Sequence, residues 1–218
     1  MNLIYLIIEI ILCYTTIIIL YQKKQKEGLY LYAIVGLILS NIMVLKRTEI
    51  LSLEIALGFT IYASIFITSN IIVQKYGPEE IKKLILVLVG STVVSTIIIF
   101  LTTLINGNTS MSIMNETFDY TFENLRIMLA NSISILIILW FNAILYHQIR
   151  RVKNKIIISN ILTSIIVSFM ATIIFSFIAY LGLVNIKELS ILILIRYLII
   201  LIIEIIGTIP IYIINKIK

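Results

Sequence analysis

Residues 84–105 read LILVLVGSTVVSTIIIFLTTLI, a run without a single charged side chain. A helix that crosses a bilayer needs about 20 consecutive apolar residues, so this run predicts a transmembrane helix. Similar runs lie at 2–21, 29–45, 51–74, 126–146, 157–184 and 190–214. Membrane β-barrels instead show segments of about ten residues that alternate in polarity. The sequence therefore predicts an all-α fold, a polytopic transmembrane bundle of about seven helices, six plus an extra N-terminal one.

The composition excludes a soluble globule and a disordered chain. Of the 218 residues 61% are apolar and 13% are charged, whereas soluble domains are about 45–50% apolar and about 25% charged. Seven helices leave no length for a soluble domain, and we expect one integral membrane domain over residues 1–218. The first apolar run lacks a basic flank before it, which favours a helix over a cleavable signal peptide.

The basic residues predict the orientation of the bundle. They collect in alternate connections and the tail: Lys23, Lys24, Lys26, Lys75, Lys82, Lys83, Arg150, Arg151, Lys153, Lys155, Lys216 and Lys218. The other connections hold few basic residues. The positive-inside rule therefore predicts an outer N-terminus and a cytoplasmic C-terminus. The net charge of +6 is explained by this pattern, and we expect no nucleic-acid partner. The residue usage is compatible with a low-GC bacterium, and we expect a bacterial cytoplasmic membrane.

Two connections have local signatures. Gly77, Pro78 and two following Glu residues predict a tight inner turn at which a new helix starts at once. The longest connection, 106–125, places apolar and acidic residues on opposite faces of a predicted helix. This amphipathic pattern favours an interfacial helix on the outer surface and leaves a lid over a substrate entrance as the alternative.

Three ionisable residues fall inside predicted spans: Glu9, Arg196 and Glu204. Such a group normally faces a protein interior or a cavity. A structural charge pair, with Glu9 and Arg196 as one combination, and a role in substrate binding are both open. The amides Asn41, Asn70, Gln74, Asn131 and Asn142 are polar groups that suit the edge of a heterocyclic base.

The sequence shows no enzyme motif. HExxH, GxSxG, CxxC and a phosphate-binding loop do not occur, and we expect no enzyme activity, no cofactor and no metal site. Cys13 is the single cysteine and cannot form an intrachain disulfide.

Residues 28–83 read GLYLYAIVGLILSNIMVLKRTEILSLEIALGFTIYASIFITSNIIVQKYGPEEIKK. This stretch resembles the vitamin uptake transporter family, which includes queuosine precursor transporters. The positions that carry the resemblance are Asn41, Lys46, Glu49, Gly58, Tyr62, Ser64, Phe66, Lys75, Tyr76, Gly77 and Glu80. It continues in Arg126, in TIIFSFIAYLG at 172–182, and in the ending with Thr208 and Pro210.

The chain departs from the family pattern at its acidic positions. Asn70 and Asn142 stand where the family has Asp, and Gln74 where it has Glu, while Ser159, Ser168 and Ala171 replace Arg, Gln and Asp. Because a carboxylate accepts two adjacent hydrogen bonds from a guanine-like edge and an amide does not, Asn70→Asp with Gln74→Glu is predicted to strengthen binding of 7-deazaguanine bases.

The resemblance implies a secondary transporter that imports a small heterocyclic metabolite, a 7-deazapurine or a related base or vitamin. The residues it suggests for substrate binding are Asn41, Lys46, Asn70, Gln74, Arg126 and Asn142. The alternatives are a non-transporting membrane partner or sensor and a substrate-binding subunit of an ATPase-driven uptake complex. The expected partners are a small-molecule substrate and the lipid bilayer, and a homodimer is left open.

Overall fold

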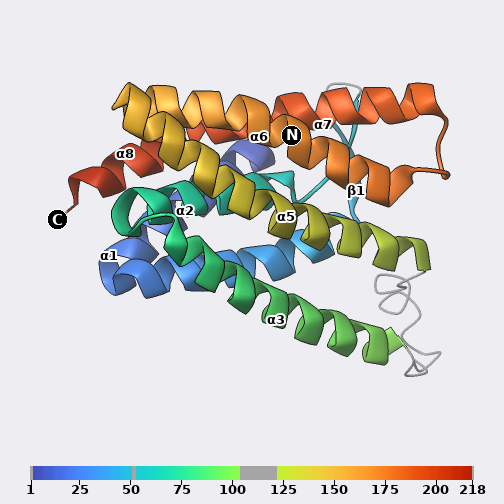
Figure 1. Cartoon of the computed structure of the whole chain (residues 1–218). Helices are drawn as coiled ribbons and strands as arrows, with labels where there is room; N and C mark the ends of the chain where they lie inside the picture. Colours follow the sequence, from blue (N-terminus) through green and yellow to red (C-terminus); the bar gives the residue numbers. More distant parts are fainter. Residues whose placement is uncertain (1, 51–52, 104–121, 218) are drawn as a thin grey trace.

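A computed structural model describes residues 2–50, 53–103 and 122–217 (Figure 1). Its helices are α1 (Asn2–Met43), α2 (Phe59–Tyr76), α3 (Glu79–Thr103), α5 (Phe122–Lys153), α6 (Ile156–Tyr180), α7 (Ile186–Ile206) and α8 (Thr208–Lys216). The strands are β1 (Arg47–Ile50) and β2 (Leu53–Ala56). The described residues thus confirm the predicted all-α class, with one short hairpin added.

Helix α1 consists of two arms that reverse direction at Gln25. Gln25 has a non-helical backbone with φ 52° and ψ −128°. Three residues later, a Cβ on Gly28 would lie 2.2 Å from the carbonyl oxygen of Leu20, a residue that a straight helix would hold about 12 Å away. The two predicted apolar runs, 2–21 and 29–45, therefore correspond to the two arms, and the charged residues between them form the turn.

The predicted helix over 51–74 is wrong in its first part. Residues 47–50 and 53–56 pair as an antiparallel hairpin, with Arg47 opposite Ala56 and Ile50 opposite Leu53. Gly58 then adopts φ 90°, which glycine tolerates best, and α2 begins at the next residue. A short apolar run does not distinguish a strand from a helix by its periodicity, which explains the error.

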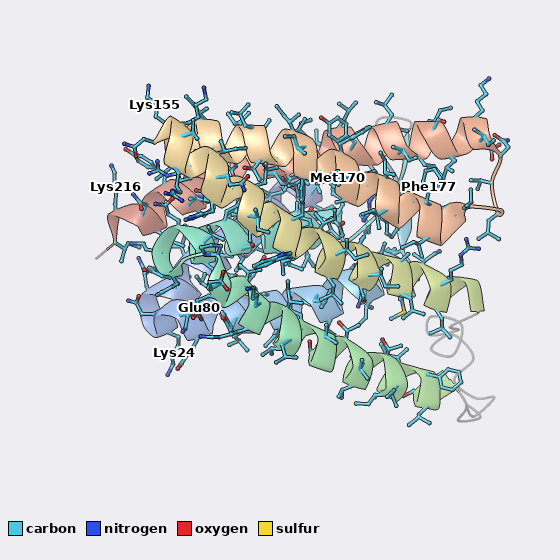
Figure 2. The ribbon with its side chains drawn as sticks, in the orientation of Figure 1. Lys24, Glu80, Lys155, Met170, Phe177 and Lys216 are labelled. Atoms are coloured by element: carbon cyan, nitrogen blue, oxygen red, sulfur yellow. The ribbon has the colours of Figure 1, made fainter. Side chains whose placement is uncertain are left out.

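Helix α2 is the central element of the bundle. It contacts α1, α3, α5, α7 and α8, and its residues from Phe59 to Val73 are buried except for Ile61. By length and composition, five segments of the described chain could cross a membrane: Leu3–Met43, Glu79–Thr102, Asn124–Lys153, Ile156–Tyr180 and Ile186–Lys216. The outward faces of these segments are apolar, as Met170 and Phe177 illustrate in Figure 2.

The turns that carry the basic residues lie at one end of the bundle. Figure 2 places Lys24, Lys155 and Lys216 there, from the α1 turn, the α5–α6 turn and the end of α8. The α2–α3 turn joins them: Gly77 adopts φ 89° and donates its N–H to the carbonyl of Val73 (3.1 Å), and α3 starts at Glu79. The tight turn predicted at 76–80 is confirmed.

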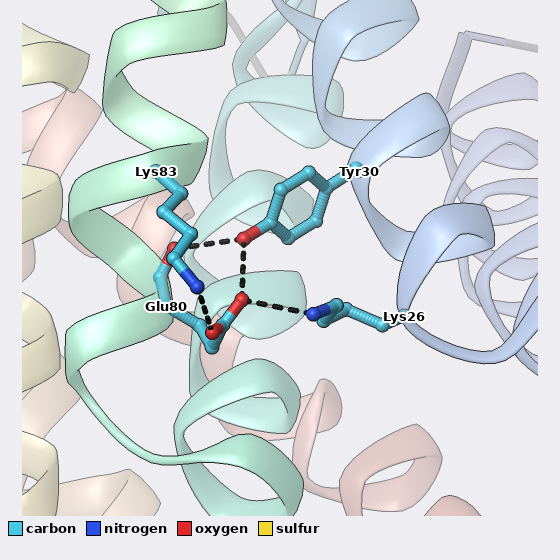
Figure 3. A network of polar contacts seen from close by, with 4 residues as sticks. All are labelled: Lys26, Tyr30, Glu80 and Lys83. Carbon is cyan, nitrogen blue, oxygen red and sulfur yellow. Dashed lines mark hydrogen bonds and ion pairs between the residues drawn. The ribbon is translucent and has the colours of Figure 1, made fainter.

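A polar network around Glu80 ties α1 to the start of α3 at this end (Figure 3). Lys26 Nζ lies 3.1 Å from Glu80 Oε2, and Lys83 Nζ lies 2.7 Å from Oε1. The Tyr30 hydroxyl donates to the Glu80 backbone carbonyl (2.8 Å) and contacts its Oε2 (3.1 Å). This network holds the second arm of α1 against the start of α3.

The last predicted run, 190–214, is a helix that is interrupted at Gly207. Pro210 has no backbone N–H, so the carbonyl of Ile206 cannot receive the usual helical bond. Gly207 also packs closely on α2, since a Cβ there would lie 2.4 Å from Ile67 Cγ1. The amphipathic segment predicted over 106–125 lies mostly outside the described residues, and its last residues belong to α5.

Candidate functional site

Polar side chains repeat every three or four residues, or at multiples of that spacing, on five elements of the bundle. This spacing places them on one face of each helix. We call the set the polar column: Tyr62, Asn70 and Gln74 on α2; Asn131, Ser134, Asn142, Tyr146 and Arg150 on α5; Asn160, Ser164 and Ser168 on α6; Arg196, Glu204 and Thr208 on α7 and α8. The column follows the length of α2 through the middle of the bundle.

The middle of the column is a chain of asparagine amides. Asn142 Nδ2 donates to Asn70 Oδ1 (2.9 Å), and Asn70 Nδ2 donates to Asn160 Oδ1 (2.9 Å). Asn160 Nδ2 donates in turn to the Glu204 carbonyl (2.8 Å) and to Thr208 Oγ1 (2.9 Å). All three amides are at most 1% exposed. They link α2, α5, α6 and the interrupted helix at the same depth.

Gln74 lies one turn closer to the basic end than Asn70. Its Oε1 accepts from Arg150 Nε (3.0 Å) and from the Tyr146 hydroxyl (3.4 Å). A cavity of about 280 Å³ opens beside it and is lined by Val73, Gln74, Tyr146, His147, Arg150, Arg151 and Asn154. The basic end of the column is therefore polar and accessible.

Asn41 lies toward the hairpin end and contacts the column at Asn131. It accepts from Asn131 Nδ2 (2.9 Å) and donates to Ser132 Oγ (2.7 Å). Asn131 also donates to Ser40 Oγ (3.0 Å). The structure thus brings Asn70 and Asn142 into direct contact and places Gln74 next to them, whereas Asn41 reaches the column only through Asn131.

The two cationic residues predicted for substrate binding, Arg126 and Lys46, lie outside the polar column. Arg126 donates from Nε to the Ile178 carbonyl and from Nη2 to the Leu181 carbonyl, each at 2.7 Å, and so caps the end of α6. A cation at a helix C-terminus interacts favourably with the unpaired carbonyls there, which explains this position. The Lys46 side chain is exposed just before β1.

The predicted pair of Glu9 with Arg196 is not formed in the described structure. The Arg196 guanidinium instead lies over two rings, 3.6 Å from the centroid of Phe175 and 5.0 Å from that of Tyr62. Glu9 is half-buried in the first arm of α1. Glu204 is 1% exposed and lies beside the hydroxyls of Ser164 and Ser168.

Sequence reasoning missed Asn160 as the residue that joins the amide chain to α7 and α8. Its signal is visible in retrospect, because Asn160, Ser164, Ser168 and Thr172 recur at intervals of four in an otherwise apolar helix. Such a row is also typical of side chains that bond back to their own helix or aid helix packing. Within the described ranges, no group of three or more His, Cys, Asp or Glu side chains is arranged to hold a metal ion.

Comparisons with known proteins agree with the resemblance in the sequence. A family described as "Putative vitamin uptake transporter" matches residues 56–214, well over half of the chain. A Bacillus subtilis (strain 168) protein named "Probable queuosine precursor transporter" is 29% identical over 73 residues, which are 34% of this chain and 32% of that relative. No solved structure matches the chain. The extent of the family match shows that the chain belongs to the vitamin uptake transporter family of membrane proteins.

Proposed function

We propose that this protein is a secondary transporter that imports a small heterocyclic metabolite, a 7-deazapurine or a related base or vitamin, through the polar column. The observation that carries this proposal is the amide chain of Asn70, Asn142 and Asn160 inside an apolar bundle. A buried amide has both hydrogen-bond donors and an acceptor. A heterocycle that enters the column can therefore replace the hydrogen bonds between the amides with hydrogen bonds to its own edge. The family and the relative's printed name supply the substrate class.

The proposed arrangement has seven crossings: the two arms of α1, then α2, α3, α5 and α6, and finally α7 with α8. Helix α2 has 18 residues, about 27 Å of helix, which nearly spans a hydrocarbon core of about 30 Å. With the basic turns in the cytoplasm, the N-terminus lies outside and the cavity beside Gln74 opens inward.

Uptake in whole cells tests the proposal. Cells that lack their own carrier are expected to accumulate radiolabelled 7-deazaguanine when they express this chain. Asn142→Leu is expected to reduce uptake strongly, because it removes the donor to Asn70. Ser190→Ala is the matched control, since Ser190 is exposed and bonds only to its own helix. Wild-type cells that accumulate no 7-deazapurine would contradict the substrate class.

A non-transporting sensor is the second candidate, and one observation favours it. The amides already satisfy one another, since Asn70 Oδ1 accepts from Asn142 and Asn70 Nδ2 donates to Asn160. Amides that satisfy one another suit a fixed role in helix packing as well as a role in which a ligand replaces their hydrogen bonds. Binding of 7-deazaguanine without uptake would support this candidate or a subunit of an ATPase-driven complex.

A further inference from the structure

Two ionisable residues on α7, the half-buried Arg196 and the buried Glu204, have buried side-chain atoms that lack hydrogen-bond partners. These atoms are Nε and Nη2 of Arg196 and Oε1 of Glu204. Leaving a buried charged group unpaired costs several kcal/mol, and such atoms in a native fold call for an explanation. Eight residues separate Arg196 from Glu204, about 12 Å along the helix, so they do not satisfy each other as helical neighbours.

The unpartnered atoms of Arg196 form one edge of its guanidinium. Nε–H and Nη2–H point the same way, side by side, in the geometry that binds a carboxylate or a pair of adjacent acceptors. The face of the guanidinium is already covered by the Phe175 ring at 3.6 Å. What Arg196 still offers is therefore an edge with two donors.

Glu204 offers the opposite chemistry. An ionised carboxylate accepts two parallel hydrogen bonds from neighbouring donors, and nothing in the described structure donates to Oε1. The hydroxyls of Ser164 and Ser168 lie beside this carboxyl without completing hydrogen bonds of their own. Asn160 holds the backbone of Glu204 through its carbonyl (2.8 Å) and so connects it to the amide chain.

Tyr62 is packed against Arg196, whose guanidinium lies 5.0 Å from the centroid of its ring. Its fully buried side chain interacts electrostatically with both Arg196 and Glu204, and its hydroxyl is 3.1 Å from Ser134 Oγ. The Phe66 ring meets it edge-on, with centroids 5.3 Å apart. Aromatic side chains of this kind form a wall on which a flat ring can pack.

We propose that Arg196 and Glu204 are the two ends of one ligand subsite, which takes a planar heterocycle with an acceptor edge toward Arg196 and a donor edge toward Glu204. The proposal rests on the proposed function and adds the residues that orient the substrate. Glu204 then provides the carboxylate that the amides of Asn70, Gln74 and Asn142 cannot provide. A guanine-like base has both kinds of group, since its carbonyl accepts while its ring N–H and exocyclic amine donate.

Calorimetry on the purified full chain tests the subsite with 7-deazaguanine, 7-deazaadenine and uracil. Wild type is expected to bind 7-deazaguanine more tightly than 7-deazaadenine. Arg196→Gln and Glu204→Gln are each expected to weaken 7-deazaguanine binding tenfold or more, the effect of losing a charge-assisted pair. Glu204→Gln should also reduce or reverse the preference, because a glutamine amide matches the exocyclic amine donor and the adjacent ring-nitrogen acceptor N1 of 7-deazaadenine. A purely structural role of Glu204 would not change the preference for 7-deazaguanine over 7-deazaadenine.

Glu188→Gln is the matched control, because Glu188 is an exposed carboxyl on the same helix. Binding of 7-deazaguanine that neither variant changes would overturn the subsite and leave the proposed function intact. Uracil binding that both variants weaken, with no binding of either purine analogue, would support the subsite and overturn the 7-deazapurine class. If wild type binds none of the three rings, both proposals fail. Should Glu204→Gln not fold, equal wild-type affinities for the two purine analogues would contradict the subsite.

Discussion

Asn70 and Gln74 lie one turn apart on α2, but their surroundings differ. Gln74 Oε1 accepts from the cationic Arg150 (3.0 Å), whereas Asn70 donates to the Asn160 carbonyl oxygen (2.9 Å). A carboxylate at 74 would strengthen the contact with Arg150. A carboxylate at 70 would lose a donor and place its charge against an acceptor. The sequence alone predicted one common effect for both substitutions, because it does not show which partner each amide has.

We therefore predict opposite effects on stability for the two single substitutions. Gln74→Glu should keep or raise the melting temperature of the purified protein. Asn70→Asp should lower it by about 5 °C, since an unsatisfied buried group costs about 1–3 kcal/mol. Thermal unfolding in detergent measures both, and equal shifts would contradict the hydrogen-bond pattern of the column.

The Glu80 network gives a second prediction for single residues. Glu80→Ala should destabilise the protein more than Glu79→Ala, because the Glu80 carboxylate contacts Lys26, Tyr30 and Lys83. The Glu79 contact is a pair with Lys82 in which both side chains are more than half exposed, and such pairs contribute about 0–1 kcal/mol. Thermal unfolding of both variants is the measurement. A Glu79→Ala loss as large as that of Glu80→Ala would show that the network does not hold α1 against α3.

At the scale of elements, the reversal of α1 depends on the absence of a side chain at Gly28. Gly28→Ala should destabilise the fold strongly, because the new Cβ would meet the backbone oxygen of Leu20 at 2.2 Å. Gly90→Ala in α3 is the control, since apart from its chain neighbours and the adjacent backbone of its own helix no atom lies within 4 Å of its Cβ position. Alanine should favour the helix there by up to about 1 kcal/mol. Expression and thermal unfolding compare the two, and a harmless Gly28→Ala would contradict the close approach.

Helices with strong apolar runs could be predicted from the sequence, and so could the turn at Gly77, whose residues determine the local backbone. The hairpin at 47–56 could not, because its strands are too short for periodicity to separate them from a helix. Arg126 was assigned to the substrate, while its contacts with the end of α6 depend on how α5 and α6 pack. Asn70 and Asn142 were both predicted as site residues because each interrupts an apolar helix, and the structure brings their amides into contact.

At the scale of the whole molecule, the basic turns at one end predict which surfaces face the cytoplasm. In a Cys13→Ser background, Lys187→Cys in the first turn of α7 should react with a membrane-impermeant maleimide added to intact cells. Lys155→Cys in the α5–α6 turn should react only after permeabilisation. Both side chains are exposed, so labelling depends on the side of the membrane from which the maleimide can reach them. Labelling of Lys155→Cys in intact cells would reverse the orientation.

The central claim is that this chain alone moves a flat heterocycle through its polar column. The most direct measurement is uptake of radiolabelled 7-deazaguanine into proteoliposomes that contain only the purified protein. We predict saturable accumulation that Asn142→Leu reduces strongly and Ser190→Ala leaves unchanged. Binding of 7-deazaguanine by the reconstituted protein without any uptake would contradict the transporter and favour a sensor or a subunit of an ATPase-driven complex.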